Sequence, residues 1–306
     1  MSLREEILLS GATGLIGGRL LSVLGRNGVA VRALTRRPDA ARPLAAPHRW
    51  VGWDGREFPA DAVASASGVV HLAGEPVFGG RLTATRRALI LASRVESTRS
   101  LVQTMAALPE PQRPRVLVCA SAVGYYGSRG DELLDEDAAP GAGFLAEVCR
   151  AWEREAFAAT PLGVRCVALR IGIVLAREGG ALPRMALPFR LGLGGRLGNG
   201  RQWFPWIHAD DVTSLIVSAL RDDAYTGPLN AVAPEPVRNT ELTRVLASAL
   251  HRPALFAVPA FALRAALGEL AGELLGSRRC QPRRALARGF AFAHPRIDTA
   301  LRSELS

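Results

Sequence analysis

The chain has 306 residues, of which 48% are apolar and 22% charged, a composition typical of a soluble globular protein with one large or two modest domains. Disorder is excluded, and no apolar stretch approaches the roughly 20 residues that a membrane-spanning helix requires. The formal charge is +10, and all 38 basic residues are arginine because the sequence contains no lysine. This excludes Schiff-base catalysis, a Walker-type phosphate loop and any Tyr-Lys proton relay, since each needs an amine with an adjustable pKa.

Apolar runs alternate with helix-length segments along the first half of the chain, the pattern that produces a parallel sheet covered by helices on both faces. The predicted strands are residues 5–10, 29–35, 48–53, 68–73, 115–121 and 164–171. The predicted helices are residues 15–27, 83–108 and 144–159. The sequence therefore predicts an α/β fold with a Rossmann-type, doubly wound parallel sheet.

Beyond Val174 the composition shifts to glycine, proline and arginine. The glycine-dense segment 191–201 predicts a mobile loop, or alternatively a linker. Aromatic residues next to it are suited to cover a ligand; they are Trp203, Phe204 and Trp206. Asp210 and Asp211 are predicted to cap a helix at residues 210–220. Further helices are predicted at residues 240–250 and 261–275.

The N-terminal residues, the cysteine spacing and the charge pattern predict the cellular location and the kinds of partner. Glu5 and Glu6 stand where a secretion signal would carry basic and then apolar residues, so we expect a cytoplasmic protein. The four cysteines lie far apart and form no Cys-x-x-Cys pair, which predicts buried free thiols. Arginine is spread over the chain without a long run of like charges, so we expect no specific nucleic-acid partner and no membrane partner. A small anionic ligand suits the basic charge.

A glycine-rich turn joins the first predicted strand to the first helix. In dinucleotide-binding turns, glycines at the positions of Gly11, Gly14 and Gly17 permit the tight turn, the close approach of a pyrophosphate and the packing of helix on strand. The helix N-terminus adds unpaired N–H groups and a positive potential. We therefore expect a bound dinucleotide. The other predicted contacts in this turn are Thr13, Leu15 and Ile16.

The end of the second strand selects between NAD and NADP. A carboxylate there would bind the ribose 2′-hydroxyl, whereas this sequence has Thr35, Arg36 and Arg37. Because a guanidinium fork grips a phosphate well, the sequence predicts NADP(H) as the cofactor; the alternative is that both arginines are solvated loop residues. Asp54, after the third strand, is expected either to accept a hydrogen bond from the adenine amino group or to stabilise a turn.

The fourth strand is expected to end beside the ribose and nicotinamide, where small residues allow a close approach. The residues at this end are Leu72, Ala73, Gly74 and Glu75. We expect residues 1–175 to form an NADP-binding domain, to which residues 205–230 return. Residues 176–306 are then mainly a substrate or cap region with a C-terminal segment.

Four motifs together resemble the extended short-chain dehydrogenases/reductases. They are the glycine turn, residues 72–75, Ser121-Ala122-Val123-Gly124-Tyr125-Tyr126-Gly127 and Trp206-Ile207-His208-x-Asp210-Asp211. Segments 93–98, 144–153, 191–195, 230–234 and 289–292 resemble, more narrowly, the atypical "epimerase family" proteins once described as cell-division-inhibitor-like. The resemblance covers nearly the whole chain. It implies a Rossmann domain that binds NADP and a small C-terminal α/β substrate domain with no well-established substrate.

The resemblance also identifies what is missing. Working extended members use a Tyr-x-x-x-Lys pair, in which the tyrosine donates a proton and the lysine holds the nicotinamide ribose. The corresponding residues here are Phe144 and Val148. Hydride transfer then needs another acid near the nicotinamide. The candidates are Ser121 at the end of the fifth strand, Tyr125 and Tyr126, which follow it, and Glu147 on the next helix.

Each of these candidates also has a structural interpretation. The two tyrosines would pack against the cofactor, and Glu147 and Glu153 would form surface salt bridges with Arg150. Arg94 is a candidate cofactor contact, and Arg94 and Arg170 are candidate anion clamps that otherwise pair with carboxylates.

The histidines are expected to serve the fold. His71 and His208 are predicted to be packed residues, and the histidine spacing predicts no metal site.

Taken together, the motifs predict an NADP(H)-dependent oxidoreductase-like protein that acts on an unknown small carbonyl or hydroxyl compound. A non-catalytic NADP-binding regulator is the alternative, and a nucleotide-sugar epimerase is the third hypothesis.

Overall fold

The structure is a computed structural model that describes residues 6–39 and 41–305. Its centre is a seven-stranded sheet in which all neighbouring strands are parallel. In spatial order the strands are β13 (Gly227–Ala231), β7 (Arg165–Ile171), β5 (Val116–Ala122), β4 (Gly68–His71), β1 (Glu6–Ser10), β2 (Ala30–Thr35) and β3 (Arg49–Gly52). The strand order reverses between β1 and β4. Open α/β sheets bind their ligands at such a reversal, outside the carboxyl ends of the strands.

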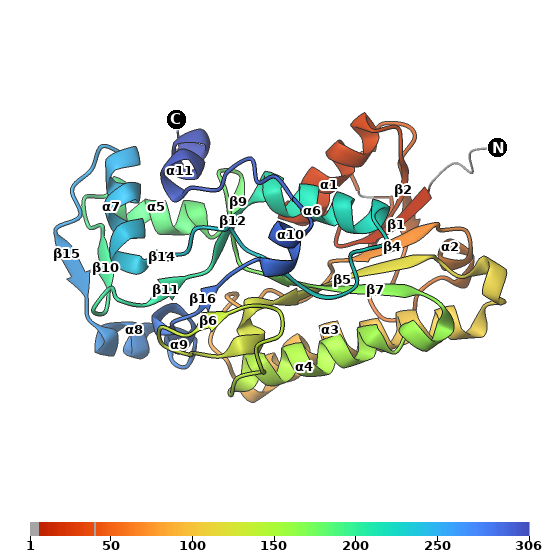
Figure 1. The fold of residues 1–306 in the computed structure, drawn as a ribbon, viewed down its shortest axis with the longest axis horizontal. Helices are drawn as coiled ribbons and strands as arrows, with labels where there is room; N and C mark the ends of the chain where they lie inside the picture. Colours follow the sequence, from red (N-terminus) through yellow and green to blue (C-terminus); the bar gives the residue numbers. More distant parts are fainter. Residues whose placement is uncertain (1–5, 40, 306) are drawn as a thin grey trace.

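Helices cover both faces of this sheet (Figure 1). They are α1 (Leu15–Arg26) and α6 (Ala209–Arg221) on one face, and α2 (Ala60–Ala64), α3 (Ala84–Ala107) and α4 (Phe144–Phe157) on the other. Successive strand residues enter opposite cores: Leu9 packs with residues of α1 and α6, and Leu8 with residues of α3 and α4. Because both faces are buried, the strands consist of nearly continuous apolar runs, as in other Rossmann-type folds.

The second half of the chain adds a smaller region of short sheets and helices beyond the carboxyl end of β7. Its short strands are β8 (Ile173–Ala176), β9 (Gly179–Gly180), β10 (Gly195–Leu197), β11 (Trp203–Phe204), β12 (Trp206–His208), β14 (Val237–Arg238), β15 (Phe256–Val258) and β16 (Arg279–Cys280). β16 pairs with β6 (Leu133–Leu134), which comes from the first half of the chain. Its helices are α5 (Leu182–Arg190), α7 (Asn239–Ala249), α8 (Ala260–Leu267), α9 (Leu270–Leu275), α10 (Arg283–Ala287) and α11 (Ile297–Leu305). A third core lies between α5, α7 and α11.

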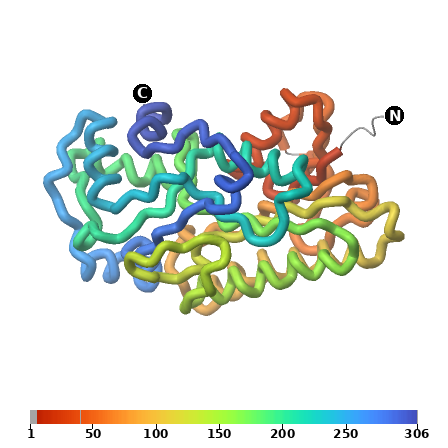
Figure 2. The backbone as a smooth tube through the Cα atoms, in the orientation of Figure 1, coloured from red at the N-terminus to blue at the C-terminus, as the bar shows by residue number. Residues whose placement is uncertain are grey.

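The last segment of the chain returns to the large sheet and is fastened to α6 (Figure 2). The Asp211 carboxylate accepts the backbone N–H groups of Ala293 at 2.7 Å and His294 at 3.1 Å. Glu304 on α11 accepts the amide of Arg177 at 2.6 Å. The Asp211 bonds join the C-terminal segment to α6, which packs on α1, and the Glu304 bond joins α11 to the end of β8.

Several sequence predictions need correction in this region. The segment 191–201 is not wholly a loop, because it contains β10, which pairs with β15. The predicted helix at 261–275 is interrupted at Gly268, where φ is +60°, and becomes α8 and α9. The side chain that caps α6 belongs to His208, whose Nδ1 accepts the amide of Asp210; Asp210 and Asp211 lie in the first turn. Trp206 was expected to cover a ligand, but its side chain is buried in the third core.

Other predictions can be compared with the structure directly. The six strands expected in the first half are present within one or two residues, although Glu5, the expected start of the first, lies outside the described residues. All four cysteines are free and buried, as predicted. Among the described residues, no helix combines the length and the apolar character that a membrane span needs.

Candidate functional site

The glycine turn at the end of β1 is packed too tightly for side chains. Gly11 has φ +76°, and a Cβ atom on it would lie 2.8 Å from the carbonyl carbon of Leu72. A Cβ atom on Gly17 would lie 2.2 Å from the backbone oxygen of Gly11. The turn between β1 and α1 therefore lies directly against the residues that follow β4. Close packing of this kind is the reason that dinucleotide-binding turns carry glycines.

The start of α1 is free to bind an anion. Its N-cap, Gly14, has no side chain to cap the helix, and the first turn contains no acidic residue. Within residues 6–39 and 41–305, the amides of Leu15, Ile16 and Gly17 have no backbone or side-chain acceptor outside the helix. Gly14 and Thr13 are exposed. These unpaired N–H groups and the positive end of the helix fit a diphosphate.

Arg36 and Arg37 follow the end of β2, and both are exposed. Neither forms an ion pair with a carboxylate of the described chain, and the amide of Arg37 donates to Thr35 Oγ1 at 3.3 Å. Asp54 has a structural partner: its Oδ1 accepts the amides of Arg56 at 2.7 Å and Glu57 at 2.9 Å. The two arginines are thus available to a phosphate, and Asp54 has the turn-stabilising role.

The end of β4 is fixed by a buried histidine. Ser10 Oγ lies 2.6 Å from His71 Nδ1 and accepts the amides of Leu72 and Ala73 at 3.2 and 3.3 Å. His71 Nε2 lies 3.1 Å from Ser97 Oγ on α3. Burial, together with the charge of Arg94, lowers the pKa of His71 to about 4, so the ring is neutral at physiological pH. The prediction that His71 is a core residue is confirmed.

The end of β4 is also tied to α3 beyond this histidine. The amide of Glu75 donates to Ser93 Oγ at 3.0 Å, and the Glu75 carboxylate accepts from Arg86 at 3.3 Å. Gly74, between Ala73 and Glu75, faces the guanidinium of Arg94. The loop that would line the nicotinamide half of a cofactor therefore has a fixed position on the long helix.

A buried polar network lies behind the end of β5. Arg170 Nε and Nη2 donate to the two carboxylate oxygens of Glu153, both at 2.9 Å, and both side chains are buried. Ser121 Oγ donates to the same carboxylate at 2.6 Å. Tyr126 Oη accepts from Arg170 at 2.9 Å and lies 2.7 Å from Asn230 Oδ1. The network joins β5, β7, β13 and α4.

This network changes the interpretation of four sequence candidates. Ser121 and Tyr126 hold the buried pair, and burial raises the pKa of the Tyr126 hydroxyl, which disfavours it as an acid. Arg170 is paired and cannot be an anion clamp. Glu153 was expected in a surface salt bridge with Arg150 but is buried against Arg170 instead. Charge spacing along a helix gives no sign of a partner on a distant strand.

Tyr125 occupies a different position from its neighbour. Its side chain is half-buried, and the guanidinium carbon of Arg170 lies 3.5 Å from the centre of its ring. The two tyrosine rings meet edge to face at 5.3 Å. Among the hydrogen bonds of the described residues, none involves the Tyr125 hydroxyl, so it is the tyrosine hydroxyl of this segment that is free for other partners.

Comparisons with known proteins identify the family of this chain. The model of the NAD dependent epimerase/dehydratase family matches residues 7–230. The chain belongs to this family. A second model, for a domain of unknown function (DUF1731), matches residues 258–304, which include α8 to α11. The chain is also 39% identical to the chloroplastic epimerase family protein SDR39U1 homolog of Arabidopsis thaliana, over 97% of this chain and 86% of that protein.

Two solved structures resemble the chain over 98% of its length. The first is human epimerase family protein SDR39U1 (isoform 2) with NADPH, at 33% identity and a TM-score of 0.86, with 99% of that chain covered. The second is the nucleoside-diphosphate sugar epimerase from Corynebacterium glutamicum, at 33% identity and a TM-score of 0.80. In that case the match covers 58% of the longer chain.

Helix α4 carries the positions at which the family resemblance places a Tyr-x-x-x-Lys pair. Phe144 is half-buried, and the guanidinium carbon of Arg87 lies 4.9 Å from its ring centre. Val148 is buried. Glu147, the carboxylate between them, is exposed in the first turn of the helix, and the ion pairs of the described residues do not include it. The structure places no tyrosine or cation of α4 at these positions.

A cluster of histidine and carboxylate groups near the start of α6 has structural partners. Among the described residues, His208, Asp210 and His294 bring possible metal-ligand atoms within 4.8 Å of one another. However, His208 Nδ1 caps the helix, and its Nε2 lies 2.9 Å from Glu304. Asp210 accepts from Arg19 at 2.5 Å. Because His208 Nδ1 caps α6 and Asp210 pairs with Arg19, we assign the cluster to the attachment of the C-terminal segment.

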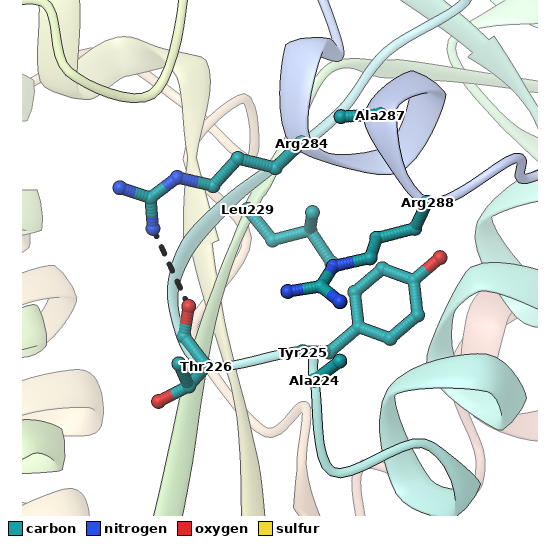
Figure 3. Close-up of a pocket in the computed structure, with 7 residues that line it drawn as sticks. All are labelled: Ala224, Tyr225, Thr226, Leu229, Arg284, Ala287 and Arg288. Atoms are coloured by element: carbon teal, nitrogen blue, oxygen red, sulfur yellow. Dashed lines mark hydrogen bonds between the residues drawn. The ribbon is translucent and has the colours of Figure 1, made fainter.

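A cavity of about 400 Å³ lies next to β13, the outermost strand on one side of the large sheet (Figure 3). Its lining includes Tyr225, Thr226 and Leu229, with the guanidinium groups of Arg284 and Arg288. Thr226 directly precedes β13, so the cavity lies at the amino end of that strand. The glycine turn and the end of β4 lie at the carboxyl ends, and this cavity is therefore separate from the candidate cofactor site.

Proposed function

We propose that this protein binds NADP(H), with the diphosphate at the start of α1 and the 2′-phosphate against Arg36 and Arg37. The observation that carries the proposal is the pair of exposed guanidinium groups at the end of β2, without a carboxylate partner in the described chain. A guanidinium binds a phosphate through two parallel hydrogen bonds. The human relative with NADPH, which is similar over nearly the whole chain, supports the same cofactor.

Isothermal titration calorimetry with NADPH and NADH tests this assignment. The wild-type protein is expected to bind NADPH at least about tenfold more tightly, since the 2′-phosphate adds charge-assisted hydrogen bonds. Arg36→Ala should narrow this difference. Arg26→Ala, which removes an exposed arginine at the end of α1, should leave it unchanged. Equal affinities of the wild type for both cofactors would contradict the proposal.

We further propose that the protein is an oxidoreductase that acts on a small carbonyl or hydroxyl compound, with Tyr125 as the proton donor. A bound nicotinamide would supply or accept the hydride. Tyr125 is favoured because it is partly accessible and its hydroxyl lacks a hydrogen bond among the described residues, whereas Ser121 and Tyr126 are engaged in the buried network. Arg170 supports one face of its ring.

NADPH oxidation in the presence of a broad panel of carbonyl compounds tests the chemistry. Tyr125→Phe is expected to abolish any turnover while leaving NADPH affinity within about twofold, because it removes only the proton donor. Tyr126→Phe is the matched comparison: it removes a buried hydroxyl that supports Arg170, so it should lower thermal stability and slow turnover without abolishing it. Full turnover by Tyr125→Phe would exclude Tyr125 as the donor.

A non-catalytic NADP-binding regulator is the second candidate function. It is favoured by the engagement of Ser121 and Tyr126 in the fold and by the absence of the Tyr-x-x-x-Lys pair. Tight NADPH binding without turnover over the whole panel would support it. Nucleoside-diphosphate sugars are tested separately, by following their conversion to an epimer, because epimerisation consumes no NADPH; one similar structure is a nucleoside-diphosphate sugar epimerase.

A further inference from the structure

The chain lacks the lysine that the family resemblance places on α4 to hold the nicotinamide ribose. Val148 stands at that position, and the sequence contains no lysine elsewhere. Three other arginines around the end of β4 and β5 are already paired with carboxylates: Arg86 with Glu75, Arg87 with Glu269 and Arg170 with Glu153. A cation for the nicotinamide half therefore has to come from another side chain.

Arg94, in the middle of α3, reaches the end of β4. If Gly74 carried a Cβ atom, this atom would lie 3.2 Å from the guanidinium carbon of Arg94 and 3.4 Å from both terminal nitrogens. The missing side chain of Gly74 thus lets the guanidinium lie against the backbone of this loop. The loop follows β4 on the edge of the sheet that carries the glycine turn, where a dinucleotide would place its nicotinamide half.

The guanidinium of Arg94 is held in place by neighbours that leave donors free. Its Nη1 donates to the carbonyl oxygen of Ile90 at 3.2 Å and lies 3.3 Å from Ser93 Oγ. Its carbon lies 5.2 Å from the ring centre of Trp152 on α4, a cation–π distance. No hydrogen bond among the described residues uses Nε or Nη2. The group therefore has an ordered position between α3 and α4 and two unused sets of N–H donors.

The charge of Arg94 is not neutralised by the protein. Within the described chain, no carboxylate lies within the 4.0 Å of an ion pair with it, and burial lowers its pKa, an effect that Cys149 and Glu75 partly offset. A guanidinium nevertheless stays protonated in proteins. A largely desolvated cation without a counter-charge is costly, and acceptor oxygens of a ligand would offset this cost. Trp152, whose ring faces the guanidinium, lies one helical turn after Val148 on α4, so the cation lies near the vacant lysine position.

We propose that Arg94 takes the place of the missing lysine and donates hydrogen bonds from α3 to the ribose hydroxyls of the nicotinamide half of NADP(H). This inference rests on the proposed function. Because the guanidinium does not release a proton, Arg94 binds and orients the cofactor but does not relay protons. The lysine's binding role and its proton-relay role are then separated in this chain.

Calorimetry with two ligands tests the proposal. NADPH contains the nicotinamide nucleoside, whereas adenosine 2′,5′-bisphosphate retains the adenosine and the 2′-phosphate but lacks it. Arg94→Gln is expected to weaken NADPH binding about tenfold or more and to leave the affinity for the bisphosphate within about twofold. Arg94→Lys should keep most of the NADPH affinity. Arg99→Gln, which removes an exposed arginine of the same helix that pairs with Glu155, should change neither affinity.

A second measurement uses the wild-type protein and does not depend on the folding of a variant. Arginines are labelled with phenylglyoxal and located by mass spectrometry. NADPH is expected to protect Arg94, and adenosine 2′,5′-bisphosphate is not. Equal protection by both ligands, or none by either, would overturn the proposal.

The outcomes separate this inference from the proposed function. A wild-type protein that binds neither ligand would refute NADP(H) binding itself. If the wild type binds both ligands tightly and Arg94→Gln lowers the affinity for both equally, or for neither, only the role of Arg94 is refuted. An equal loss would assign Arg94 to the support of the loop at Gly74.

Discussion

Acid is expected to destabilise this fold through His71, the buried histidine at the end of β4. Its pKa is about 4 in the folded chain, mainly because of burial, and that of an unperturbed histidine is about 6.5. Between these values the unfolded chain binds a proton that the folded chain does not. Above pH 6.5 His71 is neutral in both states, so its contribution to the free energy of unfolding does not change with pH. As the pH drops from 6.5 toward 4, the free energy of unfolding falls. A difference of about 2.5 pKa units corresponds to about 3 kcal/mol, of which about 2 kcal/mol is lost by pH 5.

Urea unfolding of the wild type and His71→Gln at pH 8 and pH 5 measures this effect. Carboxylates and other histidines titrate in both proteins, so the difference between the two free energies of unfolding isolates His71. The variant is less stable at pH 8 because it loses packing and hydrogen bonds to Ser10 or Ser97. The stability difference should narrow by about 2 kcal/mol at pH 5. His251→Gln, at an exposed site, should show no such narrowing. A difference that is the same at both pH values would refute the argument from burial.

Two further predictions compare matched sites. Gly17→Ala would place its Cβ atom 2.2 Å from the backbone oxygen of Gly11, so this variant should bind NADPH at least about tenfold more weakly and have a lower Tm. A Cβ atom on Gly18 would have its nearest neighbour 3.8 Å away. Gly18→Ala should therefore bind NADPH normally and gain up to about 1 kcal/mol of stability, and calorimetry with thermal melts distinguishes the two. Glu153→Gln leaves Arg170 buried without a counter-charge, so it should lower the free energy of unfolding in urea by about 3–5 kcal/mol. Glu155→Gln removes the partner of the half-exposed Arg99 and should lower it by less than about 1 kcal/mol. Similar costs at the two glutamates would contradict the account of the buried pair.

The sheet and the glycine turn are predictable from the sequence because local patterns determine them. Each parallel strand is buried on both faces and so consists of a continuous apolar run, and the helix after β1 begins where Gly14 ends the turn. The six strands expected in the first half are found for this reason. The strand β13 adds a seventh at the edge of the sheet. It is not predicted from the sequence, because Gly227 and Pro228 are weak strand formers.

The second half was harder to predict because its elements depend on distant partners. β10 lies in a glycine-dense segment and forms only through β15, which follows about 60 residues later in the chain. The break between α8 and α9 requires a positive φ at Gly268, which periodicity does not reveal. Glu153 and Arg170 meet because α4 packs on β7, and no spacing within α4 indicates this pair.

The buried network affects the candidate proton donor although the four side chains of the network are themselves buried. Ser121 and Tyr126 bind the Glu153–Arg170 pair, and the Arg170 guanidinium in turn supports the ring of Tyr125. The position of the candidate donor therefore depends on groups that are themselves unavailable as acids. Because a donor has to lie within hydrogen-bond distance of the reacting oxygen, a shift of this support would change proton transfer without a change in substrate contacts. Ser121 and Tyr126, which the sequence indicated as catalytic, are thus expected to act on Tyr125 through Arg170, as positioning residues.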